Sequence, residues 1–348
     1  MNFFQKTWRS NLLIKVRSWE YWPFEVVYAP IFAYWIWLSL KARSLFFFSA
    51  SNPSIENGGM LGESKIKILD LIPSSIKPAT LYFHNDVAPD VVLSRLEKEK
   101  LNFPIICKPD IGERGWLVQK IKSAGDLAAY IHKCPVAFLV QEFLSEPIEM
   151  GVFYYRYPSQ KEGKVTSIVI KEMLQVTGDG HSTLKELILR SDRAKLQWNT
   201  LKRQYNGQLS RVLDKGQRKE LVSIGNHCLG TKFMNGNRLI NDRLYRVFDR
   251  ISTSIPGFYF GRFDLRVATI EDLYEGNIKI MELNGAGSEP AHIYDPGFSF
   301  FKGLKVLFHH WKVLYEISVE NHERGVPYLS FRQGRAEYAK VRALNKLK

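Results

Sequence analysis

The sequence is poor in cysteine and lacks the short cysteine and histidine motifs that bind metals. Its three cysteines, Cys107, Cys134 and Cys228, lie far apart in a chain of 348 residues and form no CxxC pair. A disulfide framework and a zinc site are therefore not expected. A chain without expected disulfide bonds suits a reducing compartment, so we expect a cytoplasmic protein or one at the inner face of the membrane.

Several common catalytic and nucleotide-binding signatures are also missing. The chain has no GxxxxGK[ST] phosphate loop, no GxGxxG that opens a helix, and no Ser/His/Asp arrangement or nucleophile elbow. Helix-turn-helix, RNA-recognition and zinc-finger patterns are absent too, so a specific nucleic-acid partner is not expected. Nothing in the sequence indicates catalysis by a protein nucleophile.

A long uninterrupted apolar run is the third absence. The most apolar stretch, residues 22–40, contains Pro23, Glu25 and Pro30, so that only 31–40 is free of interruptions. A membrane-spanning helix needs about 20 apolar residues, and the stretch has no small-residue cleavage site typical of a signal peptide. Two interpretations stay open: an interfacial aromatic helix that rests on anionic lipid, and a helix buried by packing. The flanking basic residues are Arg9, Lys15, Arg17, Lys41 and Arg43.

The composition that is present is that of a folded globular protein with basic character. Hydrophobic residues make up 45% of the chain and charged residues 24%, and Lys plus Arg exceed Asp plus Glu by 49 − 35 = 14. This excess favours anionic partners. We expect an N-terminal region over 1–95, a two-lobed domain over 96–320 with lobes at about 100–180 and 181–320, and a basic, solvated tail over 321–348.

Strand and helix patterns alternate along the two-lobed domain, which is typical of α/β or α+β architecture. Strands are expected at 80–83, 103–108, 139–142, 150–155, 165–175, 259–267 and 277–283, and helices at 184–205, 241–254 and 300–320.

The segment FPIICKPDIGERGWLVQKI carries the sharpest local signal. An apolar strand delivers Lys108, a loop with Gly112 and Gly115 follows, and a second strand comes after it. A lysine at this place can neutralise nucleotide phosphates, and glycines let backbone N–H groups approach anionic oxygens closely.

Oxygen ligands gather on two later strands. Asp264 lies within FGRFDLR, and Glu282 and Asn284 end the strand of KIMELNG. Because residues two apart on a strand face the same side, Glu282 and Asn284 point together, as do Arg262 and Asp264. Such a set suits Mg²⁺ shared with substrate phosphates, and Arg262 can stabilise charge that develops on a transferring group.

Five motifs together resemble those of the ATP-grasp enzymes: KPDIGERG, VQEFLSEPIEMGV, VTGDGHSTLKELI, GRFDLR and MELNG occur in that order. The resemblance covers about residues 100–297 and is closest to the branch of the D-alanyl-D-alanine ligases, with TGDGHSTLKELI similar to a stretch of cyanophycin-synthetase-like ligases. It implies an α+β fold in which two lobes grip ATP. The aromatic residues 1–95 are atypical of the branch.

The resemblance also implies roles for individual residues. Lys108 would bind phosphate, Gln141 the adenine amino group and Glu149 the ribose, while Leu144 would offer a hinge backbone group. The implied ATP-binding residues are Lys108, Gly112, Gly115, Gln141, Leu144, Glu149 and Lys171. The implied ligands of Mg²⁺, or of Mn²⁺, are Asp264, Glu282 and Asn284. Arg262 and Lys108 would be the catalytic residues.

The activity implied is ATP-dependent ligation. A carboxylate would be activated as an acyl phosphate and passed to an amine or a thiol, with release of ADP and phosphate. The loop departs from the serine-rich loop of D-alanyl-D-alanine ligases by carrying Glu113, Arg114 and Trp116, so the substrate is not transferable. The alternative is an ATP-grasp kinase or a non-catalytic nucleotide-binding protein associated with the membrane through residues 22–40, and an oligomer is compatible with either.

Three further features each have a functional and a purely structural interpretation. His227 could orient a second substrate or be a satisfied, partly buried residue. Residues 57–65 and 292–295 could line an acceptor pocket or form tight turns. A basic helical run could contact an acidic substrate or be a solvated face; its residues are Arg190, Arg193, Lys195, Lys202 and Arg203.

Overall fold

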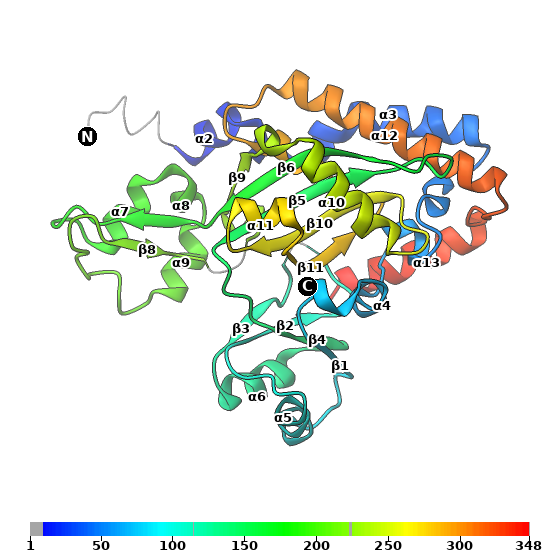
Figure 1. Ribbon diagram of the computed structural model, residues 1–348. Helices are drawn as coiled ribbons and strands as arrows, with labels where there is room; N and C mark the ends of the chain where they lie inside the picture. Colours follow the sequence, from blue (N-terminus) through cyan, green and yellow to red (C-terminus); the bar gives the residue numbers. More distant parts are fainter. Residues whose placement is uncertain (1–9, 114, 223–224, 348) are drawn as a thin grey trace.

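Two antiparallel sheets form the body of the molecule, and a smaller ribbon subdomain extends to one side (Figure 1). The computed structural model describes residues 10–113, 115–222 and 225–347. Helices and antiparallel strands are mixed along the chain, so the α+β class expected from the sequence is confirmed.

The smaller sheet has one face on its own core and one face toward the larger sheet. Its strands, in the order β1-β4-β2-β3, are β1 (Thr80–Phe83), β2 (Ile105–Pro109), β3 (Gln119–Ile121) and β4 (Phe138–Glu142). Helices α5 (Pro89–Lys98) and α6 (Ala124–Lys133) bury Ile105 and Cys107. Since Lys108 pairs with Leu139 and Ile106 with Gln141, Lys108 and Gln141 lie on the other face.

The larger sheet buries one face completely against helices. Its strands, in the order β11-β10-β5-β6-β9, are β5 (Ile148–Tyr155), β6 (Lys164–Glu172), β9 (Lys232–Asn235), β10 (Phe260–Val267) and β11 (Lys279–Asn284). Helix α10 (Asp242–Thr253) and helix α11 (Ile270–Glu275) cover this face. Phe263 and Leu265 of β10 are fully buried there with Leu244 and Phe248 of α10.

The opposite face of the larger sheet is divided along its strands. At one end Phe153 and Phe260 pack against helix α12 (Phe300–Glu323). Farther along the same face of β10 the side chains become charged, at Arg262, Asp264 and Arg266. The face of β10 opposite α10 is therefore apolar at the start of the strand and charged from Arg262 onward.

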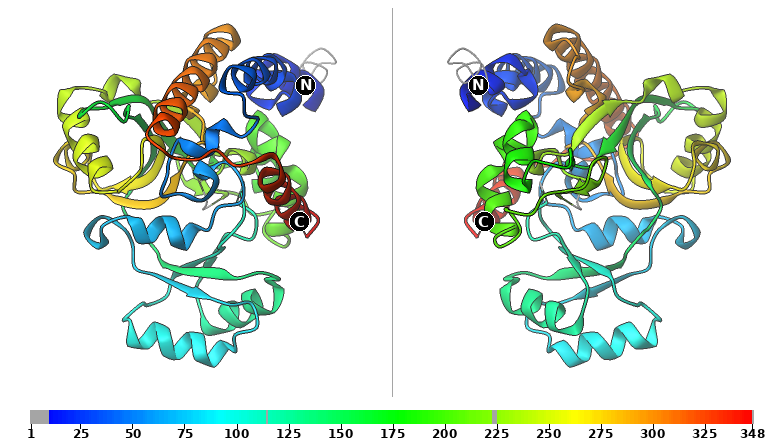
Figure 2. Two further views of the ribbon diagram at one scale, coloured as in Figure 1. Left: turned by 90° about the vertical axis from the view of Figure 1, so that its right-hand side faces the viewer. Right: turned by 90° about the vertical axis from the view of Figure 1, so that its left-hand side faces the viewer.

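An outer layer of helices comes from the two ends of the chain. Helix α2 (Asn11–Arg17) and helix α3 (Phe24–Ala42) lie with α12 at the end of the molecule opposite α5 and α6 (Figure 2). Helix α3 packs along α12, with Tyr34 and Phe308 ring centroids 5.1 Å apart and Lys41 over the ring of Tyr315. Helix α4 (Lys65–Leu71) lies closer to the centre and contacts β11.

Helix α3 continues through Pro30, so this proline interrupts the apolar run without ending the helix. A proline inside a helix leaves one carbonyl unpaired, but Pro30 lies on the exposed side, where water can pair with that carbonyl. Among the described residues, no helix has the length and apolar character needed to cross a membrane. Val27 and Ile31 are buried against α12, while other apolar side chains of α3 are exposed.

The ribbon subdomain corrects a second expectation, since residues 184–205 form three helices and not one. Its elements are β7 (Gln175–Thr177), β8 (Arg218–Glu220), α7 (Leu184–Arg190), α8 (Asp192–Leu196) and α9 (Trp198–Gln204). Ser191 has extended backbone angles that end α7, and its hydroxyl caps α8. The strand expected over 165–175 likewise ends at Glu172, before the separate strand β7.

The basic stretch expected as a solvated tail contains helix α13 (Phe331–Asn345). Most of its side chains are exposed, and Gly334 packs against the ring of Phe46. Short 3-10 helices occupy Trp19–Tyr21, Phe47–Ala50, Glu56–Gly59, Ser74–Ile76, His227–Leu229, Asn237–Leu239 and Ala291–Tyr294.

Candidate active site

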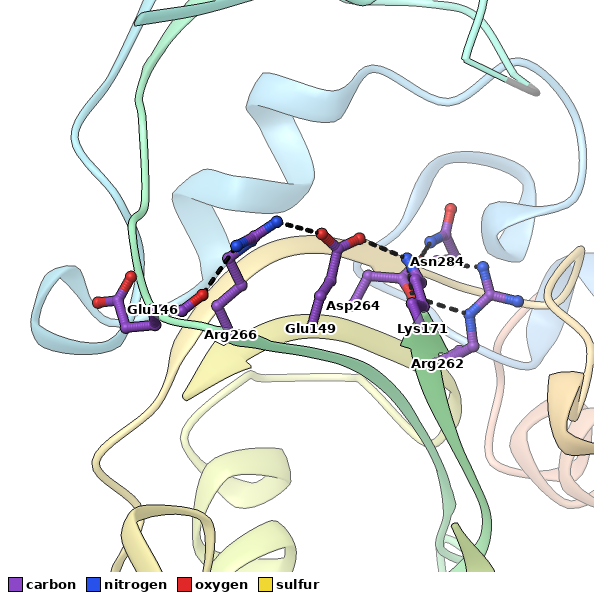
Figure 3. Close-up of polar contacts among 7 residues, drawn as sticks. All are labelled: Glu146, Glu149, Lys171, Arg262, Asp264, Arg266 and Asn284. Carbon is purple, nitrogen blue, oxygen red and sulfur yellow. Dashed lines mark hydrogen bonds and ion pairs between the residues drawn. The ribbon is translucent and has the colours of Figure 1, made fainter. Parts of the chain in front are cut away.

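A row of charged side chains crosses the polar half of the larger sheet (Figure 3). Arg266 pairs with Glu149 at 2.6 Å, and the other oxygen of Glu149 accepts from Lys171 at 3.0 Å. Lys171 reaches Asp264 at 3.3 Å, and Asp264 pairs with Arg262 at 3.0 Å. The polar face, as we call Glu149, Lys171, Arg262, Asp264 and Arg266, thus holds three cations and two carboxylates.

Asp264 is the centre of this network. Its Oδ2 accepts from Arg262 and, at 3.1 Å, from the side-chain amide of Asn284, while its Oδ1 faces Lys171. Burial by itself would raise the pKa of Asp264, but Arg262 and Lys171 hold it below the ordinary value. Burial lowers the pKa of Lys171, and Asp264 and Glu149 more than offset it, so that pKa is raised. Both groups are therefore charged at neutral pH.

A glycine on the neighbouring strand makes room for the network. Gly151 pairs with Asp264 across β5 and β10, and a Cβ added there would lie 3.0 Å from Asp264 Oδ1 and 3.1 Å from Arg262 Cδ. These distances are shorter than normal carbon contacts, so a side chain at 151 would displace the ion pair. Asp264 can reach Lys171 on β6 because Gly151, on the strand β5 between them, has no side chain.

The smaller sheet contributes a lysine to the space above the polar face. Lys108 is buried, and its Nζ donates to Gln141 Oε1 at 3.0 Å and to the carbonyl of Met281 at 3.2 Å. Burial lowers the pKa of Lys108 to about 8, although Glu282 and Asp264 oppose this shift. The lysine is therefore mostly protonated at neutral pH, and its hydrogen bonds to described residues go to carbonyl oxygens.

The glycine loop after β2 lies over the site between two anchors. Asp110 accepts from the backbone N–H of Ile66 at 2.9 Å at the start of α4, and Lys65 donates to the carbonyl of Gly112. Gly115 has a φ of +74°, and a Cβ there would lie 2.6 Å from the Asn226 side chain. Only glycine is free of strain at this position, because the backbone is left-handed and the approach is close.

Two oxygen donors beside the network remain available to a cation. Glu282 pairs with Asp264 across β11 and β10 and is half-buried, and its carboxylate has no hydrogen bond or ion pair with any described residue. Asn284 uses its NH₂ group toward Asp264, which leaves its amide oxygen for another partner. Carboxylate and amide oxygens are ligands of a hard divalent ion, so the three expected ligands fit Mg²⁺ or Mn²⁺ in donor chemistry. No cluster of three or more His, Cys, Asp or Glu residues suited to a metal occurs in the described part of the chain.

The structure adds residues that the sequence patterns did not reveal. The carboxylate of Glu289 accepts from Tyr28 and, at 2.7 Å, from Tyr294, and its backbone carbonyl accepts from Arg262 at 3.2 Å. Burial raises the pKa of Glu289 to about 7, against the lowering effect of Tyr294. The position of Glu289 shortly after the MELNG motif was the one feature of the sequence that could have indicated a role in the site. Arg266 was also missed as a partner of Glu149.

The remaining candidates lie in different places. Leu144 is buried in the segment that joins β4 to β5, between the two sheets. His227 bonds to Glu20 at 2.9 Å and packs on Phe233, as its structural interpretation requires. The turn of residues 57–59 packs on the end of β11, where Gly59 accepts from the N–H of Gly287.

The other segment and the basic run also have structural partners. Within 292–295, His292 is buried on Ser167 and Asp295 accepts from the N–H of Asn235. Arg193 of the basic run pairs with Glu20 at 2.6 Å, and Arg190 pairs with Asp179.

Comparison with known proteins finds distant likenesses to solved structures. No family model and no curated protein matches the chain. It is similar to the VanG D-Ala:D-Ser ligase of Enterococcus faecalis, with 14% identity, a TM-score of 0.42, and coverage of 72% of this chain and 61% of that one. A D-alanine–D-alanine ligase of Bacillus anthracis has 13% identity and a TM-score of 0.42, with coverage of 75% of this chain and 69% of that one. The ATP-grasp ligase PsnB has 16% identity and a TM-score of 0.34, with coverage of 65% of this chain and 52% of that one.

These likenesses are too distant to assign a substrate or a reaction to this chain. The chain spans 61% of the length of the first of these structures. The names of all three structures describe ligases, and one of them is called an ATP-grasp ligase.

Proposed function

We propose that the protein is an ATP- and Mg²⁺-dependent ligase that activates a carboxylate as an acyl phosphate and transfers it to an amine or a thiol. The observation that carries the proposal is the polar face, where three partly buried cations pair with two carboxylates, beneath buried Lys108 and next to the unengaged oxygens of Glu282 and Asn284. With Lys108 and Glu282 included, four cations stand against three carboxylates, and this excess favours an anionic ligand that supplies the missing countercharge.

Binding of the nucleotide would use the facing surfaces of the two sheets. Among the described residues, the ammonium group of Lys108 donates to carbonyl oxygens, so a phosphate oxygen would be a stronger partner for it. Gln141 lies beside it, and the carbonyl of Met281 accepts from both side chains. Gly115 and its neighbours would bring backbone N–H groups to the phosphates.

A bound divalent ion would supply charge neutralisation for the phosphates, and Asp264, Glu282 and Asn284 are the residues that would hold it. Asp264 is already ionised and oriented by Arg262, Lys171 and Asn284. Arg262 lies where it can stabilise negative charge on the transferring group, since its position is fixed by Asp264 on one side and the Glu289 carbonyl on the other.

The second substrate would enter beyond Arg262. A cavity of about 20 Å³, room for roughly one water molecule, lies beside Glu289 and is lined in part by Tyr28 and Ser288. Glu289 has a pKa near 7 and can hold or accept a proton from an amine at neutral pH. This side of the site is built partly from Tyr28 of α3, in the N-terminal region.

The test is to incubate the protein with ATP, Mg²⁺, hydroxylamine and a panel of carboxylates. A ligase gives ADP, phosphate and a hydroxamate with one class of carboxylate, because hydroxylamine traps an acyl phosphate. A stable phosphorylated product without hydroxamate would replace the ligase proposal by the kinase alternative. Release of AMP and pyrophosphate would contradict both.

A further inference from the structure

Helix α3 is apolar on all sides but covered on only one. Its inner side packs on α12 through Val27, Ile31 and Leu38, which are at most 4% exposed. Its outer side exposes Val26, Ile36, Trp37 and Leu40, with Leu40 73% exposed. A helix that is apolar all round is normally buried all round.

The exposed residues form one continuous stripe. From Val26 the stripe passes through Pro30 and Ala33 to Trp37 and Leu40, at the three- and four-residue spacing of a single helix face. The fourteen helical steps from Val26 to Leu40 span roughly 21 Å. Phe32 flanks the stripe, and Leu12 and Val16 of α2 are exposed as well. Large exposed apolar patches mark interaction sites.

Basic residues lie at the C-terminal end of the stripe and on the neighbouring helix α2. Lys15 lies on α2, Lys41 ends α3 and Arg43 follows it, all exposed. Within residues 10–43, all of which are described, Glu25 is the only exposed carboxylate, because Glu20 is held by Arg193 and His227. The exposed residues at the start of α12 are Phe301, Lys302 and Lys305.

We propose that this surface, the α3 stripe with its basic border, docks on the surface of an anionic membrane, with α3 in the plane of the headgroups. An interfacial helix combines a buried apolar face with cations that meet anionic lipid, and both parts are present here. A second copy of the chain is disfavoured, because a twofold contact through this face would bring the two sets of cations together. The surface lies on the outside of the molecule, away from α5 and α6 (Figure 2).

Docking would also place the site against the membrane side of the protein. Tyr28 on the inner side of α3 donates to Glu289, whose carbonyl is bound by Arg262. One helix therefore separates the docked surface from the segment beside the polar face. A substrate that is anchored in lipid could reach the site without leaving the interface.

The test is flotation of the full-length protein with vesicles of phosphatidylcholine alone and of phosphatidylcholine with phosphatidylglycerol. The variant is Ile36→Glu with Leu40→Glu. The matched control is Phe331→Glu with Tyr338→Glu, which places the same charges on α13 at residues that are both 60% exposed. We expect binding only to the anionic vesicles, weakened by salt and reduced at least ~10-fold in the α3 variant but not in the control.

Two results would overturn the proposal. One is the absence of binding to anionic vesicles at low salt, or binding that the α3 variant leaves unchanged. The other is a dimer in light scattering that the α3 variant dissociates while vesicles remain unbound, which would assign the face to a second copy. Phosphate release measured without vesicles tests the ligase proposal separately.

Discussion

The molecule contains two clusters of buried charge, and they differ in what they leave unsatisfied. On the polar face, Asp264 and Glu149 share three cations, and Glu282 stands beside them with no bond to a described residue. In the second cluster, Glu20 accepts two hydrogen bonds from Arg193, at 2.8 and 2.6 Å, and one contact from His227. The second cluster joins the N-terminal region to the ribbon subdomain at α8.

The comparison teaches that buried charge alone does not identify a site. Glu20 and Arg193 neutralise each other, and Arg193 also donates to the carbonyl of Thr231. Such a pair fixes the position of one element on another. The polar face, taken together with Lys108 and Glu282, instead has one more cation than carboxylates and has oxygen donors that no described residue uses, so a bound anion would improve the electrostatic balance.

The largest effect should come from Glu282→Gln. Its carboxylate makes no bond that stabilises the fold, so we expect a loss of phosphate release of at least ~100-fold with an almost unchanged melting temperature. The measurement is steady-state phosphate release with thermal unfolding in parallel. Glu172→Gln, at an exposed carboxylate of β6 paired with Lys232, is the control and should keep full activity. Equal losses in the two variants would remove Glu282 from the site.

Glu20→Gln should have the opposite signature. The change leaves Arg193 without its counter-ion in a place where the Glu20 side chain is 5% exposed, so we expect roughly 3 kcal/mol lower stability. The turnover number should stay within about threefold of the original, because the described contacts of Glu20 and Arg193 do not reach the polar face. Chemical unfolding and steady-state kinetics together check this. A large fall in turnover at full stability would show that the second cluster is functional.

Gly151→Ala should damage the polar face through packing alone. The new methyl group would press on Asp264 and Arg262, which we expect to cost about 2 kcal/mol in stability and ~10-fold or more in activity. Gly125→Ala in α6 is the control, because nothing lies closer than 3.8 Å to its added Cβ and alanine favours a helix. Normal activity in Gly151→Ala would mean that the ion pair need not be held so closely.

The smallest effect should be the pH dependence that Glu289 gives to stability. Because burial raises its pKa to about 7 from 4.5, the folded state binds more protons than the unfolded state between these values. Stability should therefore fall as pH rises through this window, by about 2 kcal/mol between pH 5 and 7 from this group. Unfolding of Glu289→Gln across the same range should show a flatter profile. If the stability of the two proteins changed equally with pH, a group other than Glu289 would be responsible for the pH dependence.

Local patterns were sufficient to predict the strands that carry the site. Thr80–Phe83 is a strand with the expected bounds, and β10 and β11 lie within one or two residues of theirs, because alternation and flanking turns define them. The same-face relation of Arg262 with Asp264 follows from strand periodicity alone.

What the sequence could not predict depends on distant parts of the chain. The contact of Asp264 with Lys171 requires the strand order β10-β5-β6 and a glycine between them, neither of which is a local property. Tyr28 of α3, far from Glu289 in the sequence, donates to its carboxylate and helps to bury it. The roles of the nucleotide-binding residues stay predictions until a nucleotide is bound.

The most direct test of the central claim is the binding of MgATP, measured by calorimetry on the unmodified protein and on Lys108→Met. The account predicts binding by the unmodified protein and at least ~10-fold weaker binding by the variant, since methionine keeps the length of the side chain and removes its charge. No binding by the unmodified protein, or equal affinity in both, would contradict the placement of a nucleotide between the two sheets.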